Sequence, residues 1–248
     1  MFSLSLLTSF RQRINTVLAA LGFSLFCCLF GALMAFVLSP AQALEAFRVS
    51  QLPQMDAQDV QSAAPGETLL FTAALTGNVP PQEGVNMVAY TVQEWRVTVP
   101  SDSGRGGDAP QPSGHWQAVE TVAPELTVEL GGQAILLHRT TPVRLSGDLH
   151  EKMVKSDSAL QAMDMDELLP DGTRRYRGLM DGDRVTVLGK KASDGGVIPN
   201  HLFAGDRVAF EESLREAAQG LFFAGLCTMV LSPLVLLGGL WFAFFRRK

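Results

Sequence analysis

Cysteine, histidine and tyrosine are scarce in this chain of 248 residues, which contains three, four and two of them respectively. All three cysteines lie in long apolar runs near the two ends, so the middle of the chain has none: Cys27, Cys28 and Cys227. This distribution excludes a disulfide framework, a cysteine nucleophile and a zinc–thiolate site in the middle of the chain. A segment of about 175 residues is nevertheless long enough to build a hydrophobic core without disulfides.

Acidic residues are missing from residues 1–38 and 220–248, where the only charges are five basic side chains: Arg11, Arg13, Arg246, Arg247 and Lys248. The middle of the chain therefore holds 15 basic and 25 acidic residues, a net charge of −10. Such a charge repels phosphate, and no basic stripe offsets it. We therefore expect no nucleic-acid partner.

Two runs contain no charged residue at all, residues 16–38 and residues 220–245. A bilayer core of about 30 Å requires roughly 20 apolar residues as helix, so both runs are long enough to span it. The second run ends in an aromatic cluster followed by three basic residues, which is typical of a cytoplasmic membrane face. We predict a juxtamembrane helix at 210–219, a transmembrane helix at 220–245 and a cytoplasmic basic tail at 246–248.

Residues 1–43 have two interpretations, a retained N-terminal membrane anchor or a signal peptide. The basic start at Arg11 and Arg13 and the A-x-A pattern ending at Ala43 permit cleavage after Ala43. The apolar run is longer than the usual signal-peptide core of about 7–15 residues, which favours the anchor. Both interpretations leave the start of the chain in the cytoplasm. We therefore expect an integral membrane protein that contacts the lipid bilayer, with its central domain extracytoplasmic and its C-terminus cytoplasmic.

The middle of the chain is typical of a β-rich domain. Residues 44–66 are polar, alanine-rich and interrupted by proline, which predicts a stalk. Residues 67–209 contain apolar and β-branched segments separated by glycine and proline, and these predict strands at 67–76, 87–99, 115–122, 125–130, 133–138 and 183–188. Residues 149–169 carry apolar side chains near helical spacing and predict a helical insertion. The expected fold class is α+β, mainly antiparallel β as a curved sheet or small barrel, with that insertion, flanked by two transmembrane helices.

Common catalytic motifs are absent from the sequence. It has no G-x-S-x-G, no H-E-x-x-H and no G-x-x-x-x-G-K-[ST] motif. The four histidines share no i,i+3 or i,i+4 spacing and are interpreted as surface or half-buried strand residues: His115, His138, His150 and His201. A catalytic dyad of Ser156 with Lys155 or Lys152 is disfavoured, because this charged stretch does not desolvate a lysine. The acidic residues at 164–171 fit a calcium-binding loop poorly. We expect no catalytic, cofactor-binding or metal residues and no cofactor.

Four segments together resemble a known family. They are LTGNV at 75–79, MVAYTVQEW at 87–95, RYRGL at 175–179 and GDRVTVLG at 182–189. Over about residues 66–219 the chain resembles the GIDE-type domain, also called BAM for "beside a membrane". In a mitochondrial E3 ubiquitin ligase, that domain lies between two transmembrane helices, and a RING finger with cysteine and histidine zinc ligands follows the second helix. The printed sequence has no such ligand set after residue 245, so we do not expect ubiquitin transfer.

The resemblance and the apolar ends favour one function over another. They predict a membrane-anchored, non-catalytic extracytoplasmic binding or scaffold module with a protein partner on that side of the membrane. The alternative is an extracytoplasmic membrane-bound hydrolase. Buried polar residues gathered in one cleft would favour the hydrolase, and an apolar or acidic flat surface would favour binding.

Overall fold

The computed structural model describes residues 3–99, 111–140 and 142–245. The chain divides into two compact units. One unit combines residues 1–51 with residues 211–248, and the other comprises residues 52–210. The predicted basic tail at 246–248 lies outside the described residues.

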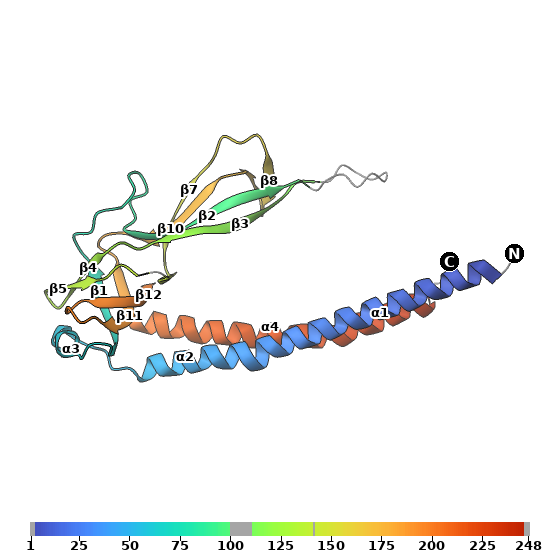
Figure 1. Ribbon diagram of the computed structural model, residues 1–248, viewed down its shortest axis with the longest axis horizontal. Coiled ribbons are helices and arrows are strands. Elements are labelled where there is room, and N and C mark those ends of the chain that lie inside the picture. The colour runs from blue at the N-terminus through green and yellow to red at the C-terminus, as the bar shows by residue number, and fades with distance from the viewer. Residues whose placement is uncertain (1–2, 100–110, 141, 246–248) are drawn as a thin grey trace. The chain divides into compact units, whose positions relative to one another are not determined.

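The first unit is helical. Its N-terminal part runs through α1 (Ser3–Leu33), the π-helix η1 (Met34–Leu38) and α2 (Ser39–Gln51) without a break (Figure 1). Helix α4 (Arg207–Phe245) begins at the end of the β-rich unit and continues through the second apolar run. The predicted helices at 210–219 and 220–245 are thus parts of one continuous helix. Two stretches, Val17–Gln51 and Arg207–Trp241, are long and apolar enough to cross a membrane.

The two helical segments of this unit pack side by side through small residues. The hydroxyls of Ser24 and Ser232 lie 2.9 Å apart, and each also donates to the other residue's carbonyl. A Cβ atom added at Gly225 would lie 2.6 Å from the Gly31 carbonyl oxygen and 2.7 Å from the Ala35 nitrogen. Only glycine permits this approach of two backbones, which is how apolar helices associate where no hydrophobic driving force exists between them.

The second unit contains a closed five-stranded barrel. Its strands follow one another around the ring in the order β11, β1, β4, β5 and β12, and β12 pairs with β11 to close it. Their bounds are β1 (Thr68–Leu75), β4 (Leu126–Leu130), β5 (Gln133–Leu137), β11 (Arg184–Lys191) and β12 (Val197–Ala204). All neighbours are antiparallel except β5 and β12, and β6 (Arg144–Gly147) pairs in parallel with residues 201–204 of β12. The predicted small, mainly antiparallel barrel is thus confirmed.

Alternating side chains fill the barrel with apolar residues. Leu69, Phe71 and Val128 are at most 1% exposed and belong to one cluster with Val185 and Val187. β-branched and aromatic side chains favour strands because they pack on a half-buried pleated surface. The barrel core is therefore the main source of stability in this unit.

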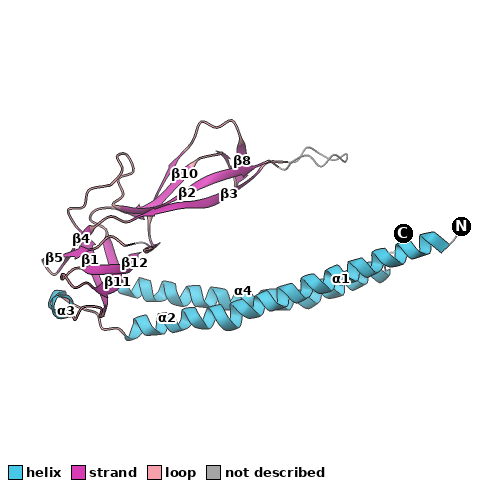
Figure 2. Ribbon diagram, viewed as in Figure 1, coloured by secondary structure: helices cyan, strands magenta, loops and turns pink. Residues whose placement is uncertain are grey.

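A second sheet occupies the rest of the unit and carries a hairpin (Figure 2). Its strand order is β3 (Ser113–Val122), β2 (Ala89–Thr98), β10 (Arg174–Leu179) and β7 (His150–Val154). The hairpin consists of β8 (Gln161–Asp164) and β9 (Glu167–Pro170). It packs through Ala162 and Leu169 against Trp95, and the Trp116 indole donates to Asp164 at 2.9 Å.

The predicted helical insertion at 149–169 is wrong, because this segment forms β7, β8 and β9. Ala162 and Leu169 are 3% and 1% exposed, whereas their neighbours Met163 and Leu168 are 57% and 52% exposed. That alternation has the period of a strand, and Trp95 provides the apolar surface that the inward residues cover. The apolar spacing that suggested a helix mixes residues from both faces of these strands.

The structure also differs from the predicted stalk at 44–66. Helix α2 extends to Gln51, and a further helix, α3 (Ala57–Ser62), follows it. Asp56 caps α3 by accepting from the backbone N–H of residues 58 and 59, and Asp59 bonds back to the Asp56 N–H. Val60 is 1% exposed in the barrel core cluster. The end of the expected stalk is therefore part of the folded β-rich unit.

Candidate functional site

A lysine is buried at the end of strand β11. Lys191 is 6% exposed, and its ammonium donates to the carbonyl oxygens of Val60 at 2.7 Å and Gly195 at 2.8 Å. Within the described part of the chain, Lys191 forms no ion pair with a carboxylate. Lysine is almost never fully buried unless it is paired, because removing its charge from water is costly. Two carbonyls use two of its three N–H donors, so one donor and the net charge are left for another group.

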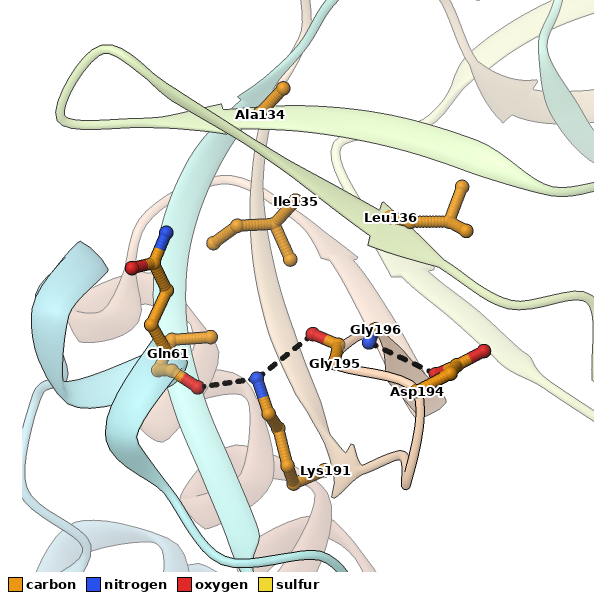
Figure 3. A pocket seen from close by; sticks show the side chains of 9 residues that line it. Gln61, Ala134, Ile135, Leu136, Lys191, Asp194, Gly195 and Gly196 are labelled. Carbon is orange, nitrogen blue, oxygen red and sulfur yellow. Dashed lines mark hydrogen bonds between the residues drawn. The ribbon is translucent and has the colours of Figure 1, made fainter.

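A cavity of about 500 Å³ adjoins this lysine (Figure 3). Volumes of about 300–1,000 Å³ are typical of small-ligand sites. The strand residues on one side are apolar, whereas the turn between β11 and β12 contributes polar backbone groups on the other. The lining residues are Val60, Gln61, Ala134, Ile135, Leu136, Lys191, Asp194, Gly195 and Gly196.

The turn is held against the end of β5 by a short polar network. An Asp194 carboxylate oxygen lies 2.9 Å from His138 Nε2 and accepts the backbone N–H of Gly196 at 3.1 Å. These two partners, the Gly196 N–H first, lower the pKa of the Asp194 carboxyl. A Cβ atom at Gly196 would collide with the His138 ring, so this position requires glycine. The turn that supplies the Gly195 carbonyl to Lys191 is therefore fixed in place.

The cavity lies at the β5–β12 seam, the place in the barrel where two neighbouring strands share the fewest paired residues. Strands β5 and β12 are paired at only one residue pair, Val197 with Leu137, whereas β4 and β5 are paired at five. The backbone N–H of His138 bonds to Val197 at 2.8 Å, next to that pair. Before Leu137, the neighbour of β5 is the β11–β12 turn instead of a strand. The seam thus leaves room for a ligand beside a strand edge.

A second polar pair lies elsewhere in the same unit, between β6 and β12. Ser146 Oγ is 2.6 Å from His201 Nε2. The His201 ring packs edge-to-face against the Phe210 ring, with 4.9 Å between the ring centroids. Burial, and then the positive charge of Arg144, lower the pKa of His201 to about 4. A serine hydrogen-bonded to a neutral histidine resembles a nucleophile with its base. A base with this pKa removes a proton poorly near neutral pH, and within the described residues no carboxylate bonds to the other ring nitrogen.

The candidate groups considered from the sequence are not brought together. Ser156 donates to the Asp171 carbonyl, and Lys152 donates to the Gly84 carbonyl. Lys155 pairs with Glu167. Across residues 3–99, 111–140 and 142–245, no three His, Cys, Asp or Glu side chains are grouped so that they could hold a metal ion.

Sequence reasoning missed both Lys191 and His201. The alternation of β11 could have indicated the buried lysine. Val185, Val187 and Gly189 lie on the buried face of the strand, and the same period of two residues places residue 191 on that face. The predicted strand at 183–188 ended before this lysine, whereas β11 extends to residue 191. For His201, the interpretation as a surface or half-buried residue underestimated its burial, since the residue is 6% exposed.

No known protein family, curated protein or solved structure matches this chain. The resemblance to the GIDE-type domain therefore stays a prediction that depends on the four sequence segments alone.

Proposed function

We propose that this protein is a membrane-anchored, non-catalytic binding protein whose β-rich domain lies outside the cytoplasm and binds a protein partner. The observation that carries the proposal is the cavity at the barrel seam, where the charge of buried Lys191 has no carboxylate partner within the described residues. None of the residues that line this cavity is a serine, threonine or cysteine, so it offers a buried charge for binding but no hydrolase nucleophile. A buried charge without a partner is costly, and an anionic group on a binding partner would offset that cost. The resemblance to the GIDE-type domain, which lies beside a membrane, agrees with this assignment.

Burial in the helical unit supports the membrane anchor. Leu18, Phe26 and Leu29 are 60–63% exposed along the apolar helix, whereas Ser24 is 7% exposed. Large apolar side chains on the outside of a helical pair suit a lipid environment, and such a surface would cause aggregation in water.

The packing of the two helical segments supports retention of the N-terminal segment. Cleavage after Ala43 would remove Ser24, Gly31 and Ala35, which make the close contacts with α4. Helix α4 would then expose Ser232 and Gly225 without the partners that they have here. A retained anchor explains why small residues occur at these matched positions on both segments.

The proposed orientation depends on charge. Basic residues flank both apolar runs on the side that we assign to the cytoplasm, and the net charge of the segment between the runs is −10. A reporter fused after Lys248 should therefore be active only in the cytoplasm, and a reporter inserted at Gly106 only outside it. Activity of both reporters on the same side would contradict the two-span topology.

The direct test of binding is photo-cross-linking in native membranes. A photoreactive amino acid at Leu136, which lines the cavity and is 42% exposed, should form a protein adduct. The matched control is Val119, which is 51% exposed on β3 in the other sheet and should give no adduct of the same mass. The Lys191→Met variant should reduce the Leu136 adduct. Absence of an adduct at Leu136 would contradict the proposed function.

The alternative function is a membrane-bound hydrolase, and the Ser146–His201 pair is the observation that favours it. If this pair is catalytic, a fluorophosphonate probe should label the purified protein at Ser146, and Ser146→Ala should abolish labelling. We expect no labelling, because the low pKa of His201 makes it a weak base and its ring is buried against Phe210. Stoichiometric labelling at Ser146 would replace the binding proposal with the hydrolase.

A further inference from the structure

The edge of β5 that faces the cavity offers backbone donors and acceptors to a ligand. Strands β4 and β5 are joined by a two-residue loop at 131–132, and such a loop is closed by a hydrogen-bonded pair, here Leu130 with Gln133. Hydrogen-bonded and non-bonded pairs then alternate along an antiparallel ladder. The backbone N–H groups of Ala134 and Leu136 are therefore directed away from β4. His138, the next residue of the same parity, confirms this direction because its N–H bonds to Val197.

No strand among the described residues covers this edge ahead of Leu137. An unpaired strand edge is a template for another extended chain, and proteins use it to bind peptides by strand addition. At about 3.3 Å per residue, the four residues 133–136 can align with a segment of roughly three residues. The cavity volume of about 500 Å³ is compatible with a ligand of that size.

We propose that this cavity binds the C-terminal end of an extended peptide, which pairs with β5 and places its terminal carboxylate on the Lys191 ammonium. This inference rests on the proposed function and names its ligand. The remaining N–H donor of Lys191 bonds to the carboxylate, and Ala134, Ile135 and Leu136 of β5 line the space for small apolar ligand residues. Carboxylate is the anion that suits a single ammonium, whereas a phosphate requires more donors than this lining provides.

Asp194 does not compete for the lysine. Its carboxylate is held by His138 and by the Gly196 backbone N–H, and among the described residues it forms no ion pair with Lys191. The lysine charge is therefore left for the ligand. Lys190, the preceding residue, provides a matched control because it carries the same charge in the same strand but is exposed.

The chain offers a simple spectroscopic test because it contains only three isoleucines: Ile14, Ile135 and Ile198. The full chain, labelled at the isoleucine methyl groups and reconstituted in nanodiscs, should give three assignable signals. Ile135 lines the cavity, Ile198 follows the Val197 pairing residue, and Ile14 lies in α1 and serves as the internal control. The probe is an equimolar pool of tripeptides made of Ala, Val, Leu and Ile with a free C-terminal carboxylate.

We expect the free-acid pool to shift the Ile135 signal in a saturable manner without moving the Ile14 signal. The same pool with a C-terminal amide should bind at least about tenfold more weakly, because it cannot form the charge-assisted hydrogen bond. Octanoate, which carries a carboxylate but no peptide backbone, should also bind at least about tenfold more weakly, because it cannot pair with β5. Equal binding of the amide pool or of octanoate would overturn the proposal, as would the absence of any shift.

Substitutions in the protein test the same contacts that the ligand variants test. Lys191→Met should weaken free-acid binding about tenfold or more and remove the preference over the amide, whereas Lys190→Met should change neither. Because Lys191→Met also removes two hydrogen bonds to carbonyls, Ala134→Pro is the second variant. It deletes an N–H that faces the cavity without removing a hydrogen bond between β4 and β5, and proline is tolerated at such a strand edge. Unchanged affinity in Ala134→Pro would contradict pairing with β5.

Failure of this inference can be told apart from failure of the proposed function. An adduct at Leu136 in native membranes, together with no effect of the tripeptide pool, would leave a binding protein with a different ligand. The absence of both would remove the proposed function as well.

Discussion

The helical unit and the barrel bury opposite kinds of side chain. In the helical pair, Phe26 and Leu29 are each 63% exposed while Ser24 and Ala35 are 7% and 1% exposed. In the barrel, apolar side chains such as Phe71 are 1% exposed inside the core. One unit therefore places its large apolar residues outside and its small ones inside, and the other does the reverse.

The proposed membrane location of the helical unit would explain both patterns, because the two units would then fold in two different solvents. In water, burying apolar area contributes about 25 cal/mol per Å², so large residues go inside. In lipid that gain disappears between helices, and close packing of small residues together with interhelical hydrogen bonds determines the contact. The difference implies that equivalent substitutions have unequal effects in the two units.

Truncation of a phenylalanine should have the largest effect on stability, and that effect should differ between the two units. Phe71→Ala should lower the free energy of unfolding of the full chain in detergent by about 3–5 kcal/mol, because it leaves a cavity in the barrel core. Phe26→Ala, on the exposed face of α1, should change it by no more than about 0.5 kcal/mol. Denaturant titration followed by tryptophan fluorescence measures both. Equal losses would break the comparison.

Acidification should destabilise the barrel unit through His201. Its folded-state pKa of about 4 lies below the ordinary 6.5, so the unfolded state binds the proton more readily. Stability from this group is fully present above about pH 6.5 and falls by about 3 kcal/mol as the pH drops through 4. The difference in unfolding free energy between the wild type and His201→Asn, measured from pH 7.5 to 3.5, isolates this contribution. A pH-independent difference would contradict the assigned burial of the neutral ring.

A bulky residue at the helix contact should disturb the helical pair. Gly225→Leu must displace the backbone of the opposite segment and should cost about 1–3 kcal/mol, whereas Gly220→Leu, with no atom within 4 Å of its added Cβ, is the control. Cysteines at Ser24 and Ser232, in a chain without the native cysteines, report the pairing by disulfide yield. Only Gly225→Leu should lower that yield, and an equal yield in both variants would show that the close contact is not needed.

The smallest effect concerns the exposed tip of the β8–β9 hairpin. Met165 has φ +53° and is 94% exposed, a backbone conformation that favours glycine. Met165→Gly should stabilise the chain by about 1 kcal/mol, because the left-handed conformation costs a residue with a Cβ about that much. Met163→Gly, in the adjacent strand, should instead destabilise it. Denaturant midpoints of the two variants compare them, and a loss of stability in Met165→Gly would contradict the strain argument.

The helical unit was predictable from the sequence to a greater extent than the barrel. Runs without charge at residues 16–38 and 220–245 indicate apolar helices whatever they pack against. Strand β12 was missed because Pro199 interrupts its pattern, and proline in a central strand argues against a strand. The structure accommodates Pro199 where the register with β11 shifts between Leu188 and Gly189.

The candidate site was less predictable because it depends on contacts between distant segments. The partners of Lys191 are carbonyls at residues 60 and 195, and the cavity lies where β5 approaches the β11–β12 turn. Every residue has a backbone carbonyl, so the sequence does not show which carbonyls a lysine will contact. The order of strands in a barrel also cannot be read from the sequence of any single strand. The sequence could place residue 191 on the inner face of a strand, but it could not show that α3 would close the cavity.

Spin-label accessibility tests the contrast between the two units most directly. Nitroxides are placed singly at Leu29 and at Met165 in the full chain, without its native cysteines, in lipid bilayers. The label at Leu29 should collide with dissolved oxygen and be protected from a water-soluble nickel chelate, whereas the label at Met165 should show the opposite preference. Nickel accessibility at Leu29 equal to that at Met165 would contradict the account, because the apolar outer face of the helical pair would then lie in water.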